Sequence, residues 1–252
     1  MAKPPSSPAG NRREVRGSLA GALVRLAETP SDASLIDDLL QRIVRLTADL
    51  VAPVSYASVT RTRGDAPTTV AMSSEVALAV DRAQYADQTG PCLETLDSGV
   101  PVAVPDIAAT MAWPGFREAA LGLGLRASLS IPLFAGAGVP VAALNLYGHD
   151  PDAMAPLITR VWTVYDPERT PTRATDPQSS DPGTEELISG LTEAFAVRAV
   201  IQQALGMIMH QRRSTAEDAY LILRVKAAET GRSLIEAAAL TRHQDDRPIP
   251  GT

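Results

Sequence analysis

The sequence predicts an α+β fold of two units: an antiparallel sheet with flanking helices, then three helices that begin with a long coiled-coil-forming helix. Three observations lead to this fold. The chain has 252 residues, 45% of them hydrophobic, which suffices for two cores. Short strand-like runs separated by Gly, Pro and Asp fill its first part. Apolar residues at helical spacing dominate its last part.

Changes in composition set the predicted boundaries. Residues 1–17 and 246–252 are predicted to be disordered tails, because they carry too little apolar surface to offset the entropy of ordering them. Residues 18–150 form the first unit and residues 184–245 the helical unit. Between them, residues 151–183 are rich in proline. Because proline fixes φ and removes an amide donor, this segment is predicted to be an extended linker that cannot continue a helix.

Each element of the first unit has its own sequence signal. An amphipathic helix spans Leu35 to Leu50, where apolar residues recur at three- and four-residue steps, and Asp32 or Ser34 is expected to cap it. The Gly-Ala-Gly turn at 136–138 joins the two strongest strands into a central hairpin. The expected strands are 56–61, 68–72, 100–104, 127–134 and 139–147, and the other expected helices are 91–98 and 113–121.

A seven-residue apolar repeat in the first C-terminal helix is typical of helices that pair with another copy. Leu187, Ala194 and Ile201 recur at this spacing, and Leu191 fills an intermediate position. We therefore expect a homodimer whose helix contacts are Leu187, Leu191, Ala194 and Ile201.

Capping signals predict where the last two helices begin. Ser214 to Glu217 and Ser233 to Glu236 both have the spacing of a capping box, in which serine and glutamate each satisfy an orphan amide. Gly231 lies between the two helices, where a left-handed residue is most easily glycine. These helices are expected to form a small three-helix core with the preceding one.

Charge is distributed unevenly between the two units. Residues 195–243 hold seven Arg or Lys and four Asp or Glu, which gives +3, so the rest of a chain with net charge -6 carries -9. This balance excludes a protein that coats a polyanion along its whole length. It favours a local basic surface in the helical unit, the kind of surface that binds nucleic acid.

Cysteine and hydropathy patterns exclude several classes of protein. Cys92 is the sole cysteine, so no intramolecular disulfide can form, and no Cys/His cluster offers the ligands of a zinc site. We therefore expect no metal. No run of eighteen apolar residues occurs, so no membrane span is expected and a cytoplasmic location is predicted.

The run from Arg198 to Met209, Arg-Ala-Val-Ile-Gln-Gln-Ala-Leu-Gly-Met-Ile-Met, together with Ala219-Tyr220 and Leu223-Arg224, resembles the ANTAR domain family. The resemblance implies a domain that binds RNA hairpins with small loops and acts as a transcription antiterminator. Arginine planes, an aromatic ring and an uncovered glycine could contact the phosphates and unstacked bases of such a loop. The residues expected to bind RNA are Arg198, Gln202, Gly206, Met209, Arg212, Arg213, Tyr220 and Arg224.

One position departs from the family's pattern. Leu205 stands where the family usually has lysine, so a charge that would contact phosphate is missing. On this interpretation, Leu205→Lys is expected to strengthen hairpin binding and to steepen its salt dependence.

The first unit resembles the GAF domain family over roughly residues 33–150. The resemblance is carried by Gly90 to Glu94, Val102 to Asp106, Ile131 to Leu133 and Ala143 to Tyr147. It implies a sensor that takes a small-molecule ligand between sheet and helices, or that binds nothing and dimerises. Cys92 is the candidate sensor residue, with a small buried hydrophobe as the alternative. No cofactor is expected.

The favoured function is a signal-responsive, RNA-binding antiterminator in which the sensor changes how two copies of helix 184–209 pair. One alternative is a DNA-binding helical regulator, which has few basic residues in 219–228 to support it. Another is a dimerisation or partner-binding module with weak RNA binding. An enzyme is not expected, since no nucleophile, base and orienting group cluster in the sequence.

Overall fold

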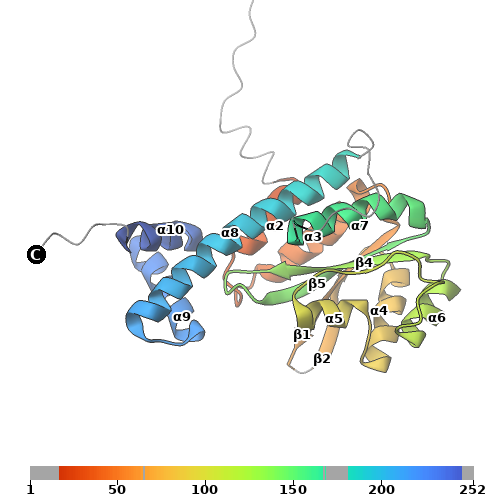
Figure 1. The fold of residues 1–252 in the computed structure, drawn as a ribbon, viewed down its shortest axis with the longest axis horizontal. Coiled ribbons are helices and arrows are strands. Elements are labelled where there is room, and N and C mark those ends of the chain that lie inside the picture. Colours follow the sequence, from red (N-terminus) through yellow and green to blue (C-terminus); the bar gives the residue numbers. More distant parts are fainter. Residues whose placement is uncertain (1–16, 65, 167, 169–180, 246–252) are drawn as a thin grey trace, which may run out of the picture.

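A five-stranded antiparallel sheet forms the centre of the N-terminal unit, with the strand order β2-β1-β5-β4-β3 (Figure 1). The structure, a computed structural model, describes residues 17–64, 66–166, 168 and 181–245. The strands are β1 (Tyr56–Arg63), β2 (Ala66–Met72), β3 (Val102–Val104), β4 (Ala127–Phe134) and β5 (Pro140–Gly148). The predicted fold class and the predicted central hairpin are confirmed.

Helices cover both faces of this sheet. One face lies under α2 (Leu19–Glu28), α3 (Ile36–Leu50), α7 (Pro151–Tyr165) and the first part of α8 (Pro182–Arg212). The other face lies under α4 (Glu75–Asp87) and α5 (Pro91–Ser98), and α6 (Pro114–Gly122) packs against α4. Because side chains alternate along a strand, the two faces carry different residues.

The face under α2, α3 and α7 is apolar. Leu144 and Leu146 of β5 are fully buried there, and the α3 residues Leu40 and Ile43 pack into the same core. The amphipathic stripe that predicts α3 is therefore its buried face. Burial of such side chains stabilises the fold by about 1.5–3 kcal/mol each.

The opposite face of the sheet is polar and equally buried. Tyr147 of β5 donates a hydrogen bond to Asp81 of α4 at 2.6 Å, and Thr69 of β2 donates another at 2.8 Å. Asn145 connects this carboxylate to further hydroxyl groups on β1 and to Ser130 on β4. We call the residues Ser58, Thr60, Thr69, Asp81, Gln84, Tyr85, Ser130, Asn145 and Tyr147 the buried polar network. Its hydrogen bonds satisfy groups that would otherwise be costly to bury.

Desolvation dominates the electrostatics of this network. Burial raises the pKa of Asp81 to about 6, although the hydrogen bonds from Tyr147, Ser58, Thr69 and Asn145 oppose the shift. Burial also raises the pKa of Tyr147, and the nearby Asp81 charge adds to this effect.

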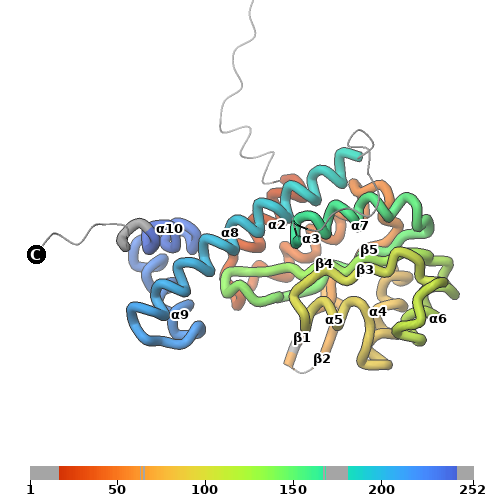
Figure 2. The backbone as a smooth tube through the Cα atoms, in the orientation of Figure 1, coloured from red at the N-terminus to blue at the C-terminus, as the bar shows by residue number. Residues whose placement is uncertain are grey.

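The long helix α8 belongs to both units, as Figures 1 and 2 show. Its first half lies along α2, where Gly190 meets Ala20 so closely that an added Cβ would be 2.6 Å from the Ala20 Cα. Glu186 accepts a hydrogen bond from the Leu19 amide at 2.9 Å and so satisfies one orphan donor at the start of α2. The second half of α8 joins α9 (Ala216–Thr230) and α10 (Leu234–Asp245).

These three helices form the predicted second core, and we call them the C-terminal unit. Its buried side chains include Ile201, Leu223 and Leu234, and Ala27 of α2 packs into the same cluster. Gly231 ends α9 in the left-handed conformation, with φ +62°. The capping box at Ser233 is confirmed, since its amide donates to Glu236 at 2.8 Å and its hydroxyl accepts from the Glu236 amide.

Two predicted caps are wrong. Helix α9 is capped by Thr215, whose hydroxyl accepts from the Asp218 amide, because Arg213 ends α8 in a left-handed conformation and Ser214 belongs to the turn. Helix α3 begins after Leu35 without a side-chain cap. Asp32, one of its predicted caps, is instead paired with a residue of α9.

The predicted linker is wrong over its first half, because residues 151–165 form α7. Asp150 caps this helix, and Pro151 occupies its first turn, where a missing amide costs nothing. Pro156 lies inside the helix and loses one hydrogen bond, but Met154, Leu157 and Val161 are buried, and their packing prevails. The end of the predicted linker is also wrong, since α8 begins at Pro182. Residues 167 and 169–180 of the linker lie outside the described residues, as do the predicted tails except Gly17.

Helix α4 had no counterpart among the predicted elements. Its buried face includes Asp81 and Gln84 as well as Ala77 and Val80, so the apolar periodicity that identifies a helix is interrupted. Among the described residues, no helix combines the length and the apolarity that a membrane span needs.

The contact between α2 and α8 predicts opposite effects for one substitution at two positions of α8. Gly190→Ala places a methyl group against Ala20 and Leu23, and should lower the free energy of unfolding by about 1–3 kcal/mol. The matched control is Gly206→Ala, whose Cβ meets nothing within 4 Å and which should raise it by about 0.8–1 kcal/mol. Urea denaturation measures both. Equal effects would contradict the close contact between the helices.

The buried carboxyl group predicts a pH dependence. Since the pKa of Asp81 is higher in the folded state, its contribution to stability is complete below pH 3.8 and is lost as the pH rises through about 6. The Asp81→Asn variant does not lose this contribution. Its free energy of unfolding, relative to that of the wild type, should therefore rise by up to about 3 kcal/mol between pH 4 and pH 7.5. Denaturation at several pH values, with exposed Asp97→Asn as the control, measures the trend. A difference that does not change with pH would refute it.

Candidate RNA interface

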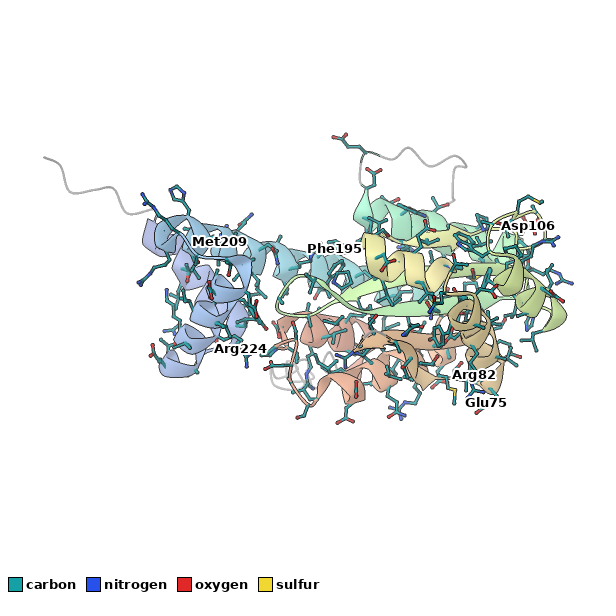
Figure 3. The ribbon with its side chains drawn as sticks, turned by 90° about the horizontal axis from the view of Figure 1, so that it is seen from below. Glu75, Arg82, Asp106, Phe195, Met209 and Arg224 are labelled. Carbon is teal, nitrogen blue, oxygen red and sulfur yellow. The ribbon has the colours of Figure 1, made fainter. Side chains whose placement is uncertain are left out.

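Four of the residues predicted to bind RNA lie along one face of α8. Arg198, Gln202, Gly206 and Met209 are spaced by four, four and three residues, so their side chains follow one line along the helix. The line starts beside the sheet and ends in the C-terminal unit. In Figure 3, Phe195 lies next to the sheet, whereas Met209 lies beyond it on the C-terminal unit.

The far end of this face is open. Gly206 is exposed, and a Cβ added to it would meet no atom within 4 Å. Met209 is also exposed, as are Arg212 and Arg213 at the end of the helix. A bare stretch of backbone on the same helix as two exposed guanidinium groups, six and seven residues further along, suits the close approach of a phosphate backbone or an unstacked base.

The near end of the face is covered by the turn between β4 and β5, residues 135–139. The Arg198 Nε donates to the Gly138 carbonyl and the Gln202 amide donates to the Ala137 carbonyl, each at 3.0 Å. The Arg198 guanidinium also lies 3.9 Å from the centre of the Phe134 ring, a cation–π contact. Desolvation lowers the pKa of Arg198 at this half-buried position.

Tyr220 and Arg224 of α9 face the loop that joins α2 to α3. The Tyr220 hydroxyl accepts a hydrogen bond from the Ser31 amide at 3.2 Å, and Arg224 forms an ion pair with Asp32 at 2.9 Å. The Arg224 guanidinium is also 5.8 Å from the Tyr220 ring centre. Of the eight predicted residues, four are thus open and four contact the N-terminal unit. These contacts join residues that are 60 to 192 positions apart in the chain, so they cannot be predicted from local sequence spacing.

Leu205 does not lie on the open surface. It is 4% exposed and packs in the core of the C-terminal unit with Ile201 and Ile208. This burial argues against the expectation that Leu205→Lys supplies a phosphate contact. A lysine here would place its stem inside a small apolar core, and its ammonium group would stay there unless it reached solvent.

The predicted dimer residues are buried within their own chain. Leu187 and Leu191 belong to the core beneath α2, Ile201 belongs to the core of the C-terminal unit, and Ala194 packs partly against it. The seven-residue repeat thus reflects packing inside one chain, and α2 takes the place of the expected second helix. The exposed large apolar side chains of the C-terminal unit are instead Met209 on α8 and Leu221, Ile222 and Val225 on α9.

Cys92, the candidate sensor residue, lies in the first turn of α5 and is fully buried beside the buried polar network. Its amide donates to Gln84 at 2.9 Å. Burial, followed by the nearby Asp81 charge, raises the pKa of the Cys92 thiol, so the thiolate is disfavoured despite the helix N-terminus. This environment agrees with the alternative interpretation, a small buried hydrophobe.

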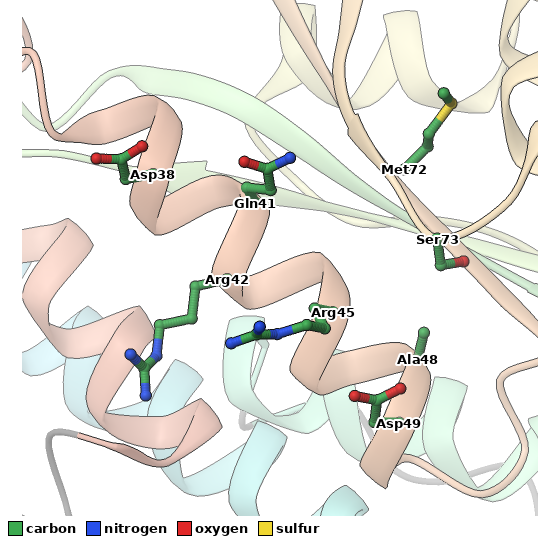
Figure 4. Close-up of a pocket in the computed structure, with 8 residues that line it drawn as sticks. All are labelled: Asp38, Gln41, Arg42, Arg45, Ala48, Asp49, Met72 and Ser73. Atoms are coloured by element: carbon green, nitrogen blue, oxygen red, sulfur yellow. The ribbon is translucent and has the colours of Figure 1, made fainter.

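No metal site is found within the residues that the structure describes, since no three His, Cys, Asp or Glu side chains come together. A shallow surface hollow lies over α3 and the end of β2 (Figure 4). Figure 4 shows Arg42 and Arg45 together with Asp38 and Asp49 along α3. Its two cations and two carboxylates balance in charge, so it offers no net attraction for an ion.

Comparison with known protein families agrees with this geometry. A family model for the GAF domain matches residues 33–163, and one for the ANTAR domain matches residues 189–240. The GAF match covers residues 151–163, most of α7, which were predicted to belong to the linker. No curated protein matches the chain.

Solved structures provide two similar chains. A domain of a two-component sensor histidine kinase protein from Sinorhizobium meliloti 1021 has 15% identity and a TM-score of 0.40, covering 73% of this chain and 100% of its own. The A. aeolicus nlh2 GAF domain in an inactive state has 11% identity and a TM-score of 0.39, covering 75% and 98%. The two family matches follow one another along the sequence without overlap, and this chain therefore belongs to the GAF domain family, as a two-domain regulator in which the GAF domain precedes an ANTAR domain.

Proposed function

We propose that this protein is a signal-responsive regulator that binds structured RNA at the loops of hairpins and so acts as a transcription antiterminator. The ANTAR family is an RNA-binding antiterminator family, and GAF domains often bind small ligands. The proposed activity is binding, not catalysis.

One observation carries the proposal: the open end of α8 joins an uncovered glycine to exposed cations. Gly206 and Met209 provide a surface for bases, and Arg212 and Arg213 provide charge for phosphates. The cations lie in the last turn and at the C-cap of α8, where positive charge also suits the helix dipole. A positive charge balance in an otherwise acidic chain limits contact with a polyanion to this unit.

The GAF domain is proposed to sense the signal. Its buried polar network lies between the sheet and α4, and the resemblance implies a ligand between the sheet and its helices. A small polar molecule that displaced part of this network would have to replace its hydrogen bonds.

Removal of the open cations should weaken RNA binding. The variant with Arg212→Ala and Arg213→Ala is expected to bind RNA hairpins less tightly. Its slope of log K against log salt should flatten by about 1–2, because binding releases fewer counterions when fewer phosphate contacts form. Filter binding over a salt series, with a library of hairpins whose small loops are randomised, measures both quantities.

The matched control for this variant is Arg45→Ala, an exposed arginine on α3 outside the ANTAR domain. It should leave affinity and salt slope unchanged. Equal losses in the two variants would assign the effect to net charge, and preference for a DNA duplex over the hairpins would favour the helical DNA-binding alternative.

The burial of Leu205 predicts a loss of stability where the family pattern alone predicts a gain of binding. Leu205→Lys should lower the free energy of unfolding by about 1–3 kcal/mol, because a polar group enters an apolar core. Leu205→Met conserves volume and should cost less than about 1.5 kcal/mol. Thermal or urea denaturation compares the two. A Lys variant that is stable and binds hairpins more tightly would place the side chain at the RNA surface.

A further inference from the structure

We infer that the β4–β5 turn of the GAF domain is an intramolecular competitor of RNA, docked on the part of the ANTAR surface that a hairpin loop needs. This inference rests on the proposed function and adds how the site is regulated. The turn, residues 135–139, lies against all three ANTAR helices. Arg198 and Gln202 of α8 bind its carbonyl groups, and Tyr220 of α9 and Leu234 of α10 lie over Gly136.

The shape of the turn makes this docking possible. A Cβ on Gly138 would clash with the Gln202 amide nitrogen, and one on Gly136 would lie 2.6 Å from the Leu234 side chain and 3.0 Å from the Tyr220 hydroxyl. Gly138 also has φ +78°, which favours glycine. Both glycines therefore let the turn approach the helices more closely than other residues would.

The chemistry of the contacts resembles that of an RNA loop. The GAF domain presents oxygen acceptors to ANTAR donors: the Ala137 and Gly138 carbonyls to Gln202 and Arg198, and the Asp32 carboxylate to Arg224. Base carbonyls and phosphates offer the same acceptors. The face of Phe134 also holds the Arg198 guanidinium, which otherwise could stack on an unpaired base. A donor in these contacts cannot serve RNA at the same time.

The docking is also suited to release. Its polar contacts lie at or near the surface, and the Asp32–Arg224 pair has side-chain exposures of 63% and 36%. Pairs of this kind are weak and sensitive to salt. RNA that binds all eight predicted residues must displace the turn, whereas RNA limited to Gly206, Met209, Arg212 and Arg213 would not.

Gly136→Ala tests the inference in the full-length protein. Its φ is not positive, so alanine fits the backbone, but the methyl group should push the turn away from Leu234 and Tyr220. Gly122→Ala is the matched control, because a Cβ there meets nothing within 4 Å. Asp32→Asn is a second opening variant that adds no bulk and leaves every predicted RNA-binding residue intact.

Each variant is examined by hydrogen exchange and by RNA binding. Hydrogen exchange of peptides that contain Ser31, whose amide donates to Tyr220, reports the docking without RNA. Filter binding with the randomised-loop hairpin library reports affinity. We expect faster exchange at Ser31 in both opening variants and not in the control. If the docked form holds about nine-tenths of the molecules, affinity should rise about tenfold on opening. RNA added to the wild-type protein should also speed exchange at Ser31.

The outcomes separate this inference from the proposed function. Faster exchange with tighter binding supports both. The inference is overturned, and the proposed function is not, if the wild-type protein binds hairpins while the Ser31 amide stays protected from exchange. The same holds if the opening variants exchange faster but do not bind hairpins more tightly. If the opening variants exchange faster but neither they nor the wild-type protein bind any hairpin, the proposed function is overturned, and the inference with it. Unchanged exchange in both opening variants overturns the docking itself.

Discussion

The packing of α2 along α8 is the contact on which the rest of the structure depends. It brings one of the first helices of the described chain against one of the last, with Gly190 allowing the backbones to approach and Glu186 satisfying an amide at the start of α2. The same α2 contributes Ala27 to the ANTAR core. Because α8 is one continuous helix of 31 residues, fixing its first half to the GAF domain also sets the direction of its second half. The face that carries Arg198 and Gln202 is thereby aimed at the β4–β5 turn.

Where local physical signals decide an element, the sequence was sufficient to predict it. The stripe of α3, the β4–β5 hairpin around its glycines, and the Ser233 capping box all act over a few residues. The family resemblance added the ANTAR surface residue by residue. Its open members, such as Gly206 and Arg212, are exposed as such a role requires.

The elements that spacing missed depend on tertiary contacts. Helix α7 tolerates Pro156 because its buried face packs on the sheet. Helix α4 turns the Asp81 carboxylate inward because the hydroxyl groups of Thr69 and Tyr147 and the amide of Asn145 donate hydrogen bonds to it. The repeat of Leu187 and Ile201 is the same whether its partner is a second copy or α2, so sequence alone could not choose between them. Nor could it show that Asp32 faces Arg224, 192 residues away.

The shared helix has a practical consequence for dissecting this protein. A cut just before α8, between the two family matches, would leave Leu187 and Leu191 without the α2 side chains that cover them. It would also remove Ala27 from the ANTAR core. Apolar side chains left bare in this way promote aggregation. The properties of an isolated ANTAR fragment would then reflect the face of α8 that α2 normally covers. An exchange of GAF domains between such regulators would succeed only if α2 and α8 are taken from the same protein.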